Sequence, residues 1–157
     1  MIKQGDTLPV VNITVIDADG QNVLASNDYF ANKKVVLFAV PGAFTPTCSA
    51  THLPGYVVNV DEIKAKGVDA VACLSVNDSF VMSAWQTAQN AEQIAMIADG
   101  GAHFTQALGL QMDTADFGGV RSQRYSMIVD NGVVTQLNIE APKAFAVSDA
   151  QTMLLQL

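Results

Sequence analysis

The sequence predicts an α/β fold with a mixed central sheet and helices on both of its faces. Segments typical of strands alternate with segments typical of helices along the 157 residues, a length that fits one domain over residues 1–157. Residues 35–40 form an unbroken, largely β-branched apolar run, which suits a strand buried on both faces. The pair Asn131-Gly132 between two apolar segments is the strongest hairpin signal in the chain.

The N-terminal half contains the elements that surround the first buried strand. A strand at residues 10–16 is expected to form an N-terminal extension of the sheet, closed by turn residues at 17–20. After the buried strand, a loop at 41–47 leads to a helix at 53–66, and Gly67 is placed to end that helix. The helix is indicated by four apolar residues at helical spacing: Leu53, Val57, Val60 and Ile63.

The C-terminal half continues the alternation and then turns antiparallel. A strand is expected at 68–76, followed by a helix that begins at an Asn77 or Asp78 cap and ends near Asn90. A strand at 94–98 and a helix at 102–108, before Gly109, come next. The chain then forms hairpin strands at 125–129 and 133–139 and a last helix at 149–156, capped by Ser148. Strand–helix–strand crossovers imply parallel pairing and the hairpin implies antiparallel pairing, so the sheet is mixed. A thioredoxin-like sheet fits this order of elements.

Composition excludes several classes of protein. Half of the residues are apolar and only 15% are charged, which excludes a disordered chain. The net charge of −7 and the presence of only two arginines make nucleic acid and anionic membranes poor partners. The longest apolar run, 35–44, falls short of the ~20 residues that a spanning helix needs. With two cysteines and no signal peptide at the N-terminus, we expect a cytoplasmic protein with reduced thiols.

The stretch PGAFTPTCS at residues 41–49 is the most informative part of the chain. It follows the carboxyl end of a buried strand, where ligands bind in open α/β sheets. Cys48 is surrounded in sequence by the hydroxyls of Thr45, Thr47 and Ser49, and a helix beginning near residue 47 would point free N–H groups at its sulfur, which favours the thiolate. Pro54 leaves two alternatives open: a first turn that contains Cys48 and leads into a kink, or a helix that begins at Pro54.

A reactive thiolate requires a cation nearby. A helix end contributes ~0.3–1 kcal/mol, whereas lowering an ordinary thiol pKa from about 8.5 to about 6 requires about 3.4 kcal/mol. A cation at ~4 Å supplies roughly that much at an effective dielectric constant near 20. Arg124, at the start of an apolar strand, is the candidate cation because it stands among uncharged residues, whereas Arg121 is expected at the surface.

The spacing Pro41-x-x-x-Thr45-x-x-Cys48 resembles the active-site motif of peroxiredoxins. The longer run PGAFTPTCS followed by THLPGY is similar to the peroxiredoxin-five or type-II subfamily. The likeness extends through VDAVACLSVNDSFV, RYSMIVDNG and the final helix, so it covers nearly the whole chain.

The resemblance implies a thiol-dependent peroxidase that reduces hydrogen peroxide and small alkyl hydroperoxides and needs no metal or organic cofactor. Its implied role is in cell redox homeostasis. Cys48 would be the peroxidatic cysteine and would pass through a sulfenic acid. Thr45 would hold the thiolate and the peroxide, Pro41 would shield the sulfur from water, and Arg124 and the N–H groups near Thr47 and Cys48 would bind the substrate. The resemblance also implies a kinked helix with Cys48 in its first turn, and a homodimer formed through loops around the active site.

Recycling of the oxidised enzyme is expected to need an outside thiol. The stretch 144–148 lacks the resolving cysteine of animal relatives, and the resemblance suggests glutathione, glutaredoxin or thioredoxin as the reductant. Cys73 lies in an apolar strand where cysteines are usually inert, and a disulfide with Cys48 is the alternative. His52 is a secondary candidate that would orient or reduce Cys48, with a local packing role as the alternative.

Competing interpretations are weaker. One zinc site needs four ligands, and the chain has two cysteines and two histidines: Cys48, His52, Cys73 and His103. Their spacing is not that of a zinc finger or a zinc ribbon. A Cys-His hydrolase would need an oriented base and an oxyanion hole, which nothing marks. A peroxide sensor would use the same Cys48 chemistry. Four aromatic residues are expected in the core, some of them lining a dimer face: Phe44, Phe80, Trp85 and Phe117.

Overall fold

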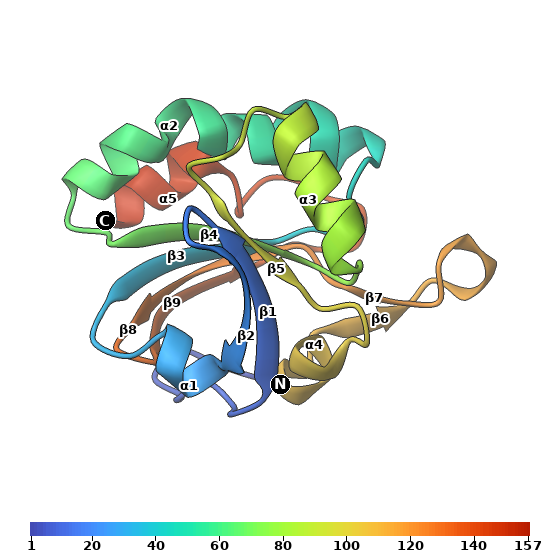
Figure 1. The fold of residues 1–157 in the computed structure, drawn as a ribbon, viewed down its shortest axis with the longest axis horizontal. Helices are drawn as coiled ribbons and strands as arrows, with labels where there is room; N and C mark the ends of the chain where they lie inside the picture. The colour runs from blue at the N-terminus through green and yellow to red at the C-terminus, as the bar shows by residue number, and fades with distance from the viewer.

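A computed structural model describes all residues from 1 to 157 and contains one large mixed sheet (Figure 1). Its strand order is β2-β1-β5-β4-β3-β8-β9. The bounds of these strands are β1 (Asn12–Asp17), β2 (Gly20–Ala25), β3 (Lys34–Ala39), β4 (Ala70–Ser75), β5 (Ala95–Ala98), β8 (Tyr125–Asp130) and β9 (Val133–Ile139). Strands β3, β4 and β5 run parallel, while β8, β9, β1 and β2 pair antiparallel, so the predicted mixed sheet is confirmed.

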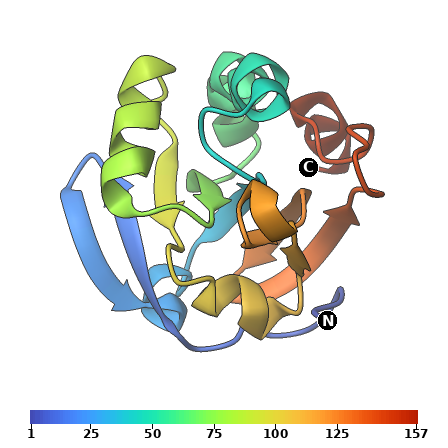
Figure 2. The same cartoon turned by 90° about the vertical axis from the view of Figure 1, so that its right-hand side faces the viewer.

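Helices cover both faces of the sheet, as the sequence predicts. Figures 1 and 2 show α2, α3 and α5 on one face and the shorter α1 and α4 on the other. Their bounds are α1 (Ser26–Tyr29), α2 (Leu53–Ala65), α3 (Ser79–Ala88), α4 (His103–Leu108) and α5 (Ala150–Gln156). No helix is both long and apolar enough to cross a bilayer.

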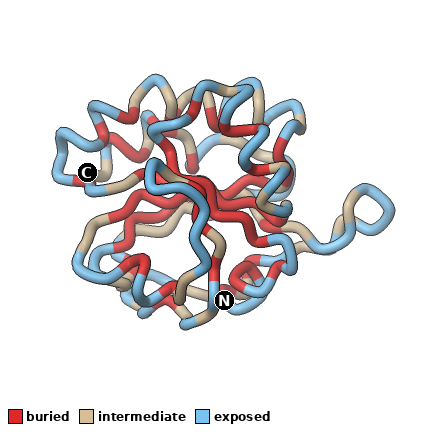
Figure 3. Tube along the Cα trace, viewed as in Figure 1, coloured by how far each residue is buried: buried red, intermediate tan, exposed pale blue.

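Strand β3 divides the core into two layers. Val36 and Phe38 face the cluster under α2, α3 and α5, whereas Val35 and Leu37 face the cluster on the other side. Side chains of a strand alternate between faces, so a continuous apolar run is what a central strand with two covered faces requires. Figure 3 shows the resulting band of buried chain through the middle of the molecule.

The C-terminal hairpin has the predicted turn. Asn131 and Gly132 have φ values of 47° and 80° between β8 and β9. Two successive residues with positive φ are the signature of a type I′ turn, for which Asn-Gly is the preferred pair. This hairpin places β8 beside β3 and thereby fixes the position of the residues that open β8.

One prediction about local structure is wrong, and some short or exposed strands are absent from the sequence-based prediction. Ser148 does not cap α5; Asp149 does, because its carboxylate accepts from the N–H of Thr152 at 3.2 Å. Strand β2 was missed because its residues are mostly exposed and lack apolar alternation. A two-stranded arm, β6 (Gln111–Asp113) and β7 (Val120–Ser122), was also missed because each strand has only three residues, and it projects from the body with a short turn at Ala115–Phe117 (Figure 1).

The aromatic residues divide between core and surface. Trp85 is fully buried, as predicted. Phe44, Phe80 and Phe117 are 55%, 85% and 73% exposed, so their placement in the core is wrong. Exposed apolar side chains occur singly on most soluble proteins, so exposure alone assigns no role to these three residues.

Candidate active site

The chain around Cys48 is helical, with one widened turn. Residues 46 and 47 are already helical, and a π-helical segment follows at Cys48–His52. The N–H of Leu53 donates to the carbonyl of Cys48, five residues back. Pro54 has no N–H for an α-helical bond to residue 50, and the wider turn directly before it accommodates this gap. Cys48 therefore lies in the first turn of the helix, where the widened turn begins, and this decides between the two alternatives that Pro54 left open.

The loop before Cys48 is held against the carboxyl end of β4. The N–H of Ala43 donates to Asn77 Oδ1 at 3.0 Å, and Thr45 Oγ1 donates to the carbonyl of Gly42 at 2.6 Å. Arg121, expected at the surface, is partly exposed, and its Nη1 donates to the carbonyl of Val76 at 2.8 Å. These bonds fix the loop and the arm to the same edge of the sheet.

Arg124 meets Cys48 because of the strand order. Strand β8 runs antiparallel to β3 with Tyr125 opposite Ala39, so the start of β8 lies where the loop to Cys48 leaves β3. Arg124 Nη2 donates to Cys48 Sγ at 3.1 Å, and the cysteine is only 1% exposed. A guanidinium in contact with a buried sulfur stabilises its anionic form. The contact between Arg124 and Cys48 that the sequence analysis predicts is therefore present in the structure.

His52 is bonded through both of its ring nitrogens. Nε2 lies 3.0 Å from the carbonyl oxygen of Ser148, and Nδ1 lies 2.8 Å from Arg124 Nη1. Burial first, and the charge of Arg124 second, lower the pKa of His52 from 6.5 to about 3. The ring is therefore neutral, so Nε2 donates to the carbonyl and Nδ1 accepts from Arg124. A ring with both nitrogens occupied has no free position from which to act as the base of a Cys-His hydrolase.

The buried neutral state of His52 makes the fold sensitive to acid. In the folded protein the ring stays neutral to about pH 3, whereas in the unfolded chain it gains a proton near pH 6.5. Lowering the pH through this window favours unfolding, at about 1.4 kcal/mol per pH unit for one such group. We expect the free energy of unfolding to fall by about 2 kcal/mol between pH 6.5 and pH 5, measured by denaturant titration. The variant His52→Gln should lose most of this slope, and a flat wild-type profile would contradict the assignment of a neutral ring.

Cys73 lies in the middle of β4 and is completely buried. Burial raises the pKa of its thiol well above the usual value, and the charge of Cys48 raises it further. Neither cysteine is in a disulfide.

No three His, Cys, Asp or Glu side chains are grouped as metal ligands, and His103 is exposed at the start of α4. The structure thus offers no support for the zinc interpretation.

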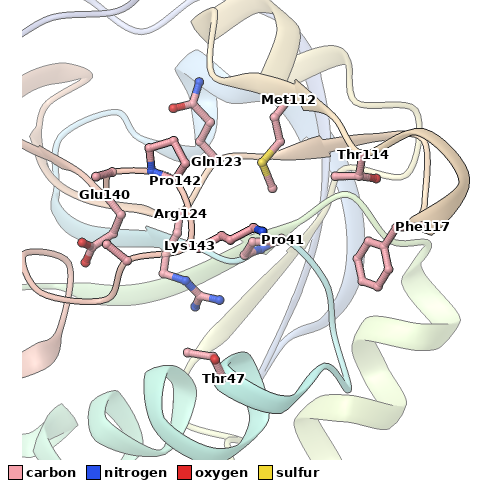
Figure 4. A pocket seen from close by; sticks show the side chains of 12 residues that line it. Pro41, Thr47, Met112, Thr114, Phe117, Gln123, Arg124, Glu140, Pro142 and Lys143 are labelled. Carbon is pink, nitrogen blue, oxygen red and sulfur yellow. The ribbon is translucent and has the colours of Figure 1, made fainter.

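A pocket of about 770 Å³ opens beside Arg124 (Figure 4). Three parts of the chain line it: Pro41 and Thr47 near Cys48, Met112 and Phe117 of the arm region, and the segment 140–144. The backbone N–H groups of Thr47 and Cys48 donate to no protein acceptor. Thr47 and the Arg124 guanidinium line the pocket together with the apolar side chains of Met112 and Phe117. This arrangement suits a small polar group that carries an apolar body.

Not every expected contact is made. The Thr45 hydroxyl donates to Gly42 rather than to Cys48, which leaves the oxygen of Thr45 as an acceptor. Sequence reasoning missed Glu140, Phe145 and Ser148, which line or support the site from a loop after β9. The only signal in the sequence is an isolated acidic residue at the end of a strand.

The similarity of the chain to known proteins agrees with this site. The Redoxin family model matches residues 3–154. Peroxiredoxin-2D of Arabidopsis thaliana is 44% identical over 156 residues, covering 98% of this chain and 96% of that protein. The crystal structure of reduced Prx3 from Vibrio vulnificus in complex with H₂O₂ is 63% identical, with a TM-score of 0.96 and 99% of each chain covered. Peroxiredoxin 5 from Alvinella pompejana is 34% identical, with a TM-score of 0.86 and coverage of 99% of this chain and 97% of that chain.

The fold and these relatives define the class: an α/β protein of the Redoxin family with a thioredoxin-like sheet. Within it, the chain belongs to the peroxiredoxins, in the type-II or peroxiredoxin-five-like subfamily. It is a thiol peroxidase, an antioxidant enzyme that reduces peroxides. The family, the fold and the enzyme class predicted from the sequence are confirmed.

Proposed function

We propose that Cys48 is the nucleophile of the peroxidase reaction. The thiolate attacks the terminal oxygen of a hydroperoxide, a sulfur–oxygen bond forms and the oxygen–oxygen bond breaks. The other oxygen leaves with the bonding electron pair and takes a proton from solvent, which gives water or an alcohol. Cys48 remains as a sulfenic acid.

The observation that carries this proposal is the 3.1 Å contact from Arg124 to the sulfur of Cys48. In the reaction the guanidinium stabilises first the thiolate and then the charge that develops on the leaving oxygen. The free N–H groups of Thr47 and Cys48 donate hydrogen bonds to the peroxide. The peroxide O–H in turn donates a hydrogen bond to the hydroxyl oxygen of Thr45. Pro41 shields this region from water at the pocket wall. The test is loss of peroxidase activity in the variants Cys48→Ser and Arg124→Gln.

We propose hydrogen peroxide and small alkyl hydroperoxides as substrates. The Vibrio vulnificus relative at 63% identity carries H₂O₂ in its structure, which supports the smallest substrate. The apolar side chains of Pro41, Met112 and Phe117 beside Arg124 support an alkyl group on the second oxygen. Comparison of kcat/KM for hydrogen peroxide and tert-butyl hydroperoxide tests this assignment, and undetectable turnover of the alkyl compound would exclude it.

We propose a one-cysteine cycle in which an outside thiol, such as glutathione, glutaredoxin or thioredoxin, reduces the sulfenic acid. The complete burial of Cys73 and the raised pKa of its thiol oppose its acting as a resolving nucleophile. The variant Cys73→Ser is expected to keep turnover within about twofold of wild type, assayed with glutathione and glutaredoxin. A collapse of turnover in a variant that remains folded would assign the recycling step to Cys73.

We propose that residues 1–157 act as one cytoplasmic domain that pairs with a second copy. One sheet containing strands from residue 12 to residue 139 supports the single domain. The exposed side chains of Phe44 and Phe117, both on segments next to the site, support a homodimer through this face. Sedimentation at micromolar concentration should give twice the monomer mass in wild type and a shift toward monomer in Phe44→Ser. A monomer in both would refute the dimer.

A further inference from the structure

Glu140, the residue after β9, is buried and holds a loop through its carboxylate. It is 7% exposed and accepts from three successive backbone N–H groups, those of Ala146, Val147 and Ser148, at 2.8–2.9 Å. The hydroxyl of Ser148 also donates to it at 2.7 Å. Burial raises the pKa of Glu140, but the bonds from Ser148, Ala146 and Val147 outweigh this and leave the pKa below its usual value. The carboxylate is therefore charged at neutral pH and bonded to the loop through both of its oxygens.

The loop fixed by Glu140 presents one carbonyl group to the site. The carbonyl oxygen of Ser148 accepts from His52 Nε2 at 3.0 Å and from the Tyr56 hydroxyl at 2.8 Å. A carbonyl can only accept, so a neutral His52 must carry its proton on Nε2. The lone pair on Nδ1 is then directed at Arg124 Nη1, 2.8 Å away. The other terminal nitrogen of Arg124 faces Cys48.

Arg124 has one further contact with this loop and one with the backbone of Glu140. Phe145 lies under the guanidinium, with its ring centre 5.7 Å from Cζ, and 4.8 Å from the centre of the His52 ring. The backbone N–H of Glu140 donates to the carbonyl of Arg124 at 3.0 Å. No ion pair joins Glu140 to Arg124, and Figure 4 shows the carboxylate turned away from the guanidinium. The carboxylate of Glu140 is thus connected to the guanidinium through the loop and His52, with no direct contact between the two charged groups.

We propose that Glu140 is a positioning residue for the peroxidase reaction: its carboxylate fixes the loop 144–148, whose Ser148 carbonyl sets the tautomer of His52 and so holds the Arg124 guanidinium toward Cys48. This inference rests on the proposed roles of Cys48 and Arg124. The charged groups that act on His52 are Arg124, Glu140 and Asp149, and only Glu140 binds the loop amides.

The test compares Glu140→Gln with Asp149→Asn in the full chain. A glutamine replaces one acceptor oxygen by an NH₂ group that opposes the loop donors, so the loop is released. Asp149→Asn removes a carboxylate next to Ser148 that caps α5 and does not bind the three amides. Nitrogen-15 NMR of the histidine rings at pH 7 reports which nitrogen of His52 is protonated, absorbance at 240 nm against pH reports thiolate formation at Cys48, and stopped flow reports the rate with hydrogen peroxide.

Wild type and Asp149→Asn are expected to show His52 protonated on Nε2 alone. Glu140→Gln is expected to show a mixture of tautomers, a thiolate titration moved to higher pH and a rate with hydrogen peroxide lower by about 10- to 100-fold. If Glu140→Gln keeps the wild-type tautomer and titration and loses only melting temperature, the residue is merely structural and the proposal is wrong. If Glu140→Gln does not fold, Glu140→Asp, with its shorter side chain, takes its place. An unchanged His52 tautomer and an unchanged Cys48 titration in Glu140→Asp would likewise show that the proposal is wrong. The tautomer of His52 is measured without turnover. A wrong assignment of Cys48 as the nucleophile would therefore leave the NMR result unchanged, so the two proposals fail independently.

Discussion

Replacing Cys48 with serine is expected to lower the rate of peroxide consumption by about 10³-fold or more. A serine hydroxyl is not ionised by a neighbouring guanidinium at neutral pH, and an alcohol is a far weaker nucleophile toward a peroxide oxygen than a thiolate. The substitution removes one buried sulfur and keeps the size of the side chain, so the fold should survive. The measurement is hydrogen peroxide loss in the presence of dithiothreitol, with circular dichroism to confirm folding.

The matched control for this variant is Cys73→Ser. It removes the other buried thiol, one strand away from the site, and separates the loss of the nucleophile from a general effect of replacing a core cysteine. Peroxide consumption retained in Cys48→Ser and lost in Cys73→Ser would reverse the assignment of the two cysteines. Consumption retained in both would remove thiol chemistry from the account.

Replacing Arg124 with glutamine is expected to lower kcat/KM for hydrogen peroxide by about 10²- to 10³-fold. The charge that stabilises both the thiolate and the leaving oxygen is lost, while the amide of glutamine still occupies the space above Phe145. The thiolate titration of Cys48 should move to higher pH in the same variant. Stopped-flow rates and absorbance at 240 nm against pH measure the two effects.

Arg124→Lys distinguishes charge from geometry. An ammonium keeps the charge but presents no fork, so it cannot contact His52 Nδ1 and Cys48 Sγ together as the two guanidinium nitrogens do. We expect a rate between those of wild type and Arg124→Gln. An unchanged rate and an unchanged thiolate titration in Arg124→Gln would refute the role given to this residue.

The sequence predicts those features that depend on local pattern. The apolar run at 35–40 identifies the central strand because a strand with two covered faces has no polar side. Asn131-Gly132 identifies the hairpin because few other pairs adopt two positive φ values. The exposed strand β2 carries no such pattern and was missed. The sequence also predicts Phe44 and Phe117 in the core, and both are exposed, because hydropathy alone does not separate a buried aromatic residue from an exposed one.

The site shows the same division. Cys48 is recognisable from its neighbours, and Arg124 from its apolar surroundings, but their 3.1 Å contact is created by the antiparallel pairing of β8 with β3. The role of Glu140 depends on a loop that folds back on its carboxylate, six to eight residues further along the chain. No spacing rule describes such a loop, so this support of the site is visible only in three dimensions.

Mass spectrometry of the protein after one equivalent of hydrogen peroxide, with a sulfenic acid trap present, tests the central claim most directly. We expect one trapped adduct, on Cys48, with Cys73 unmodified and no disulfide between them. An unmodified Cys48, oxidation that begins at Cys73, or a Cys48–Cys73 bond formed in place of the adduct would contradict the account.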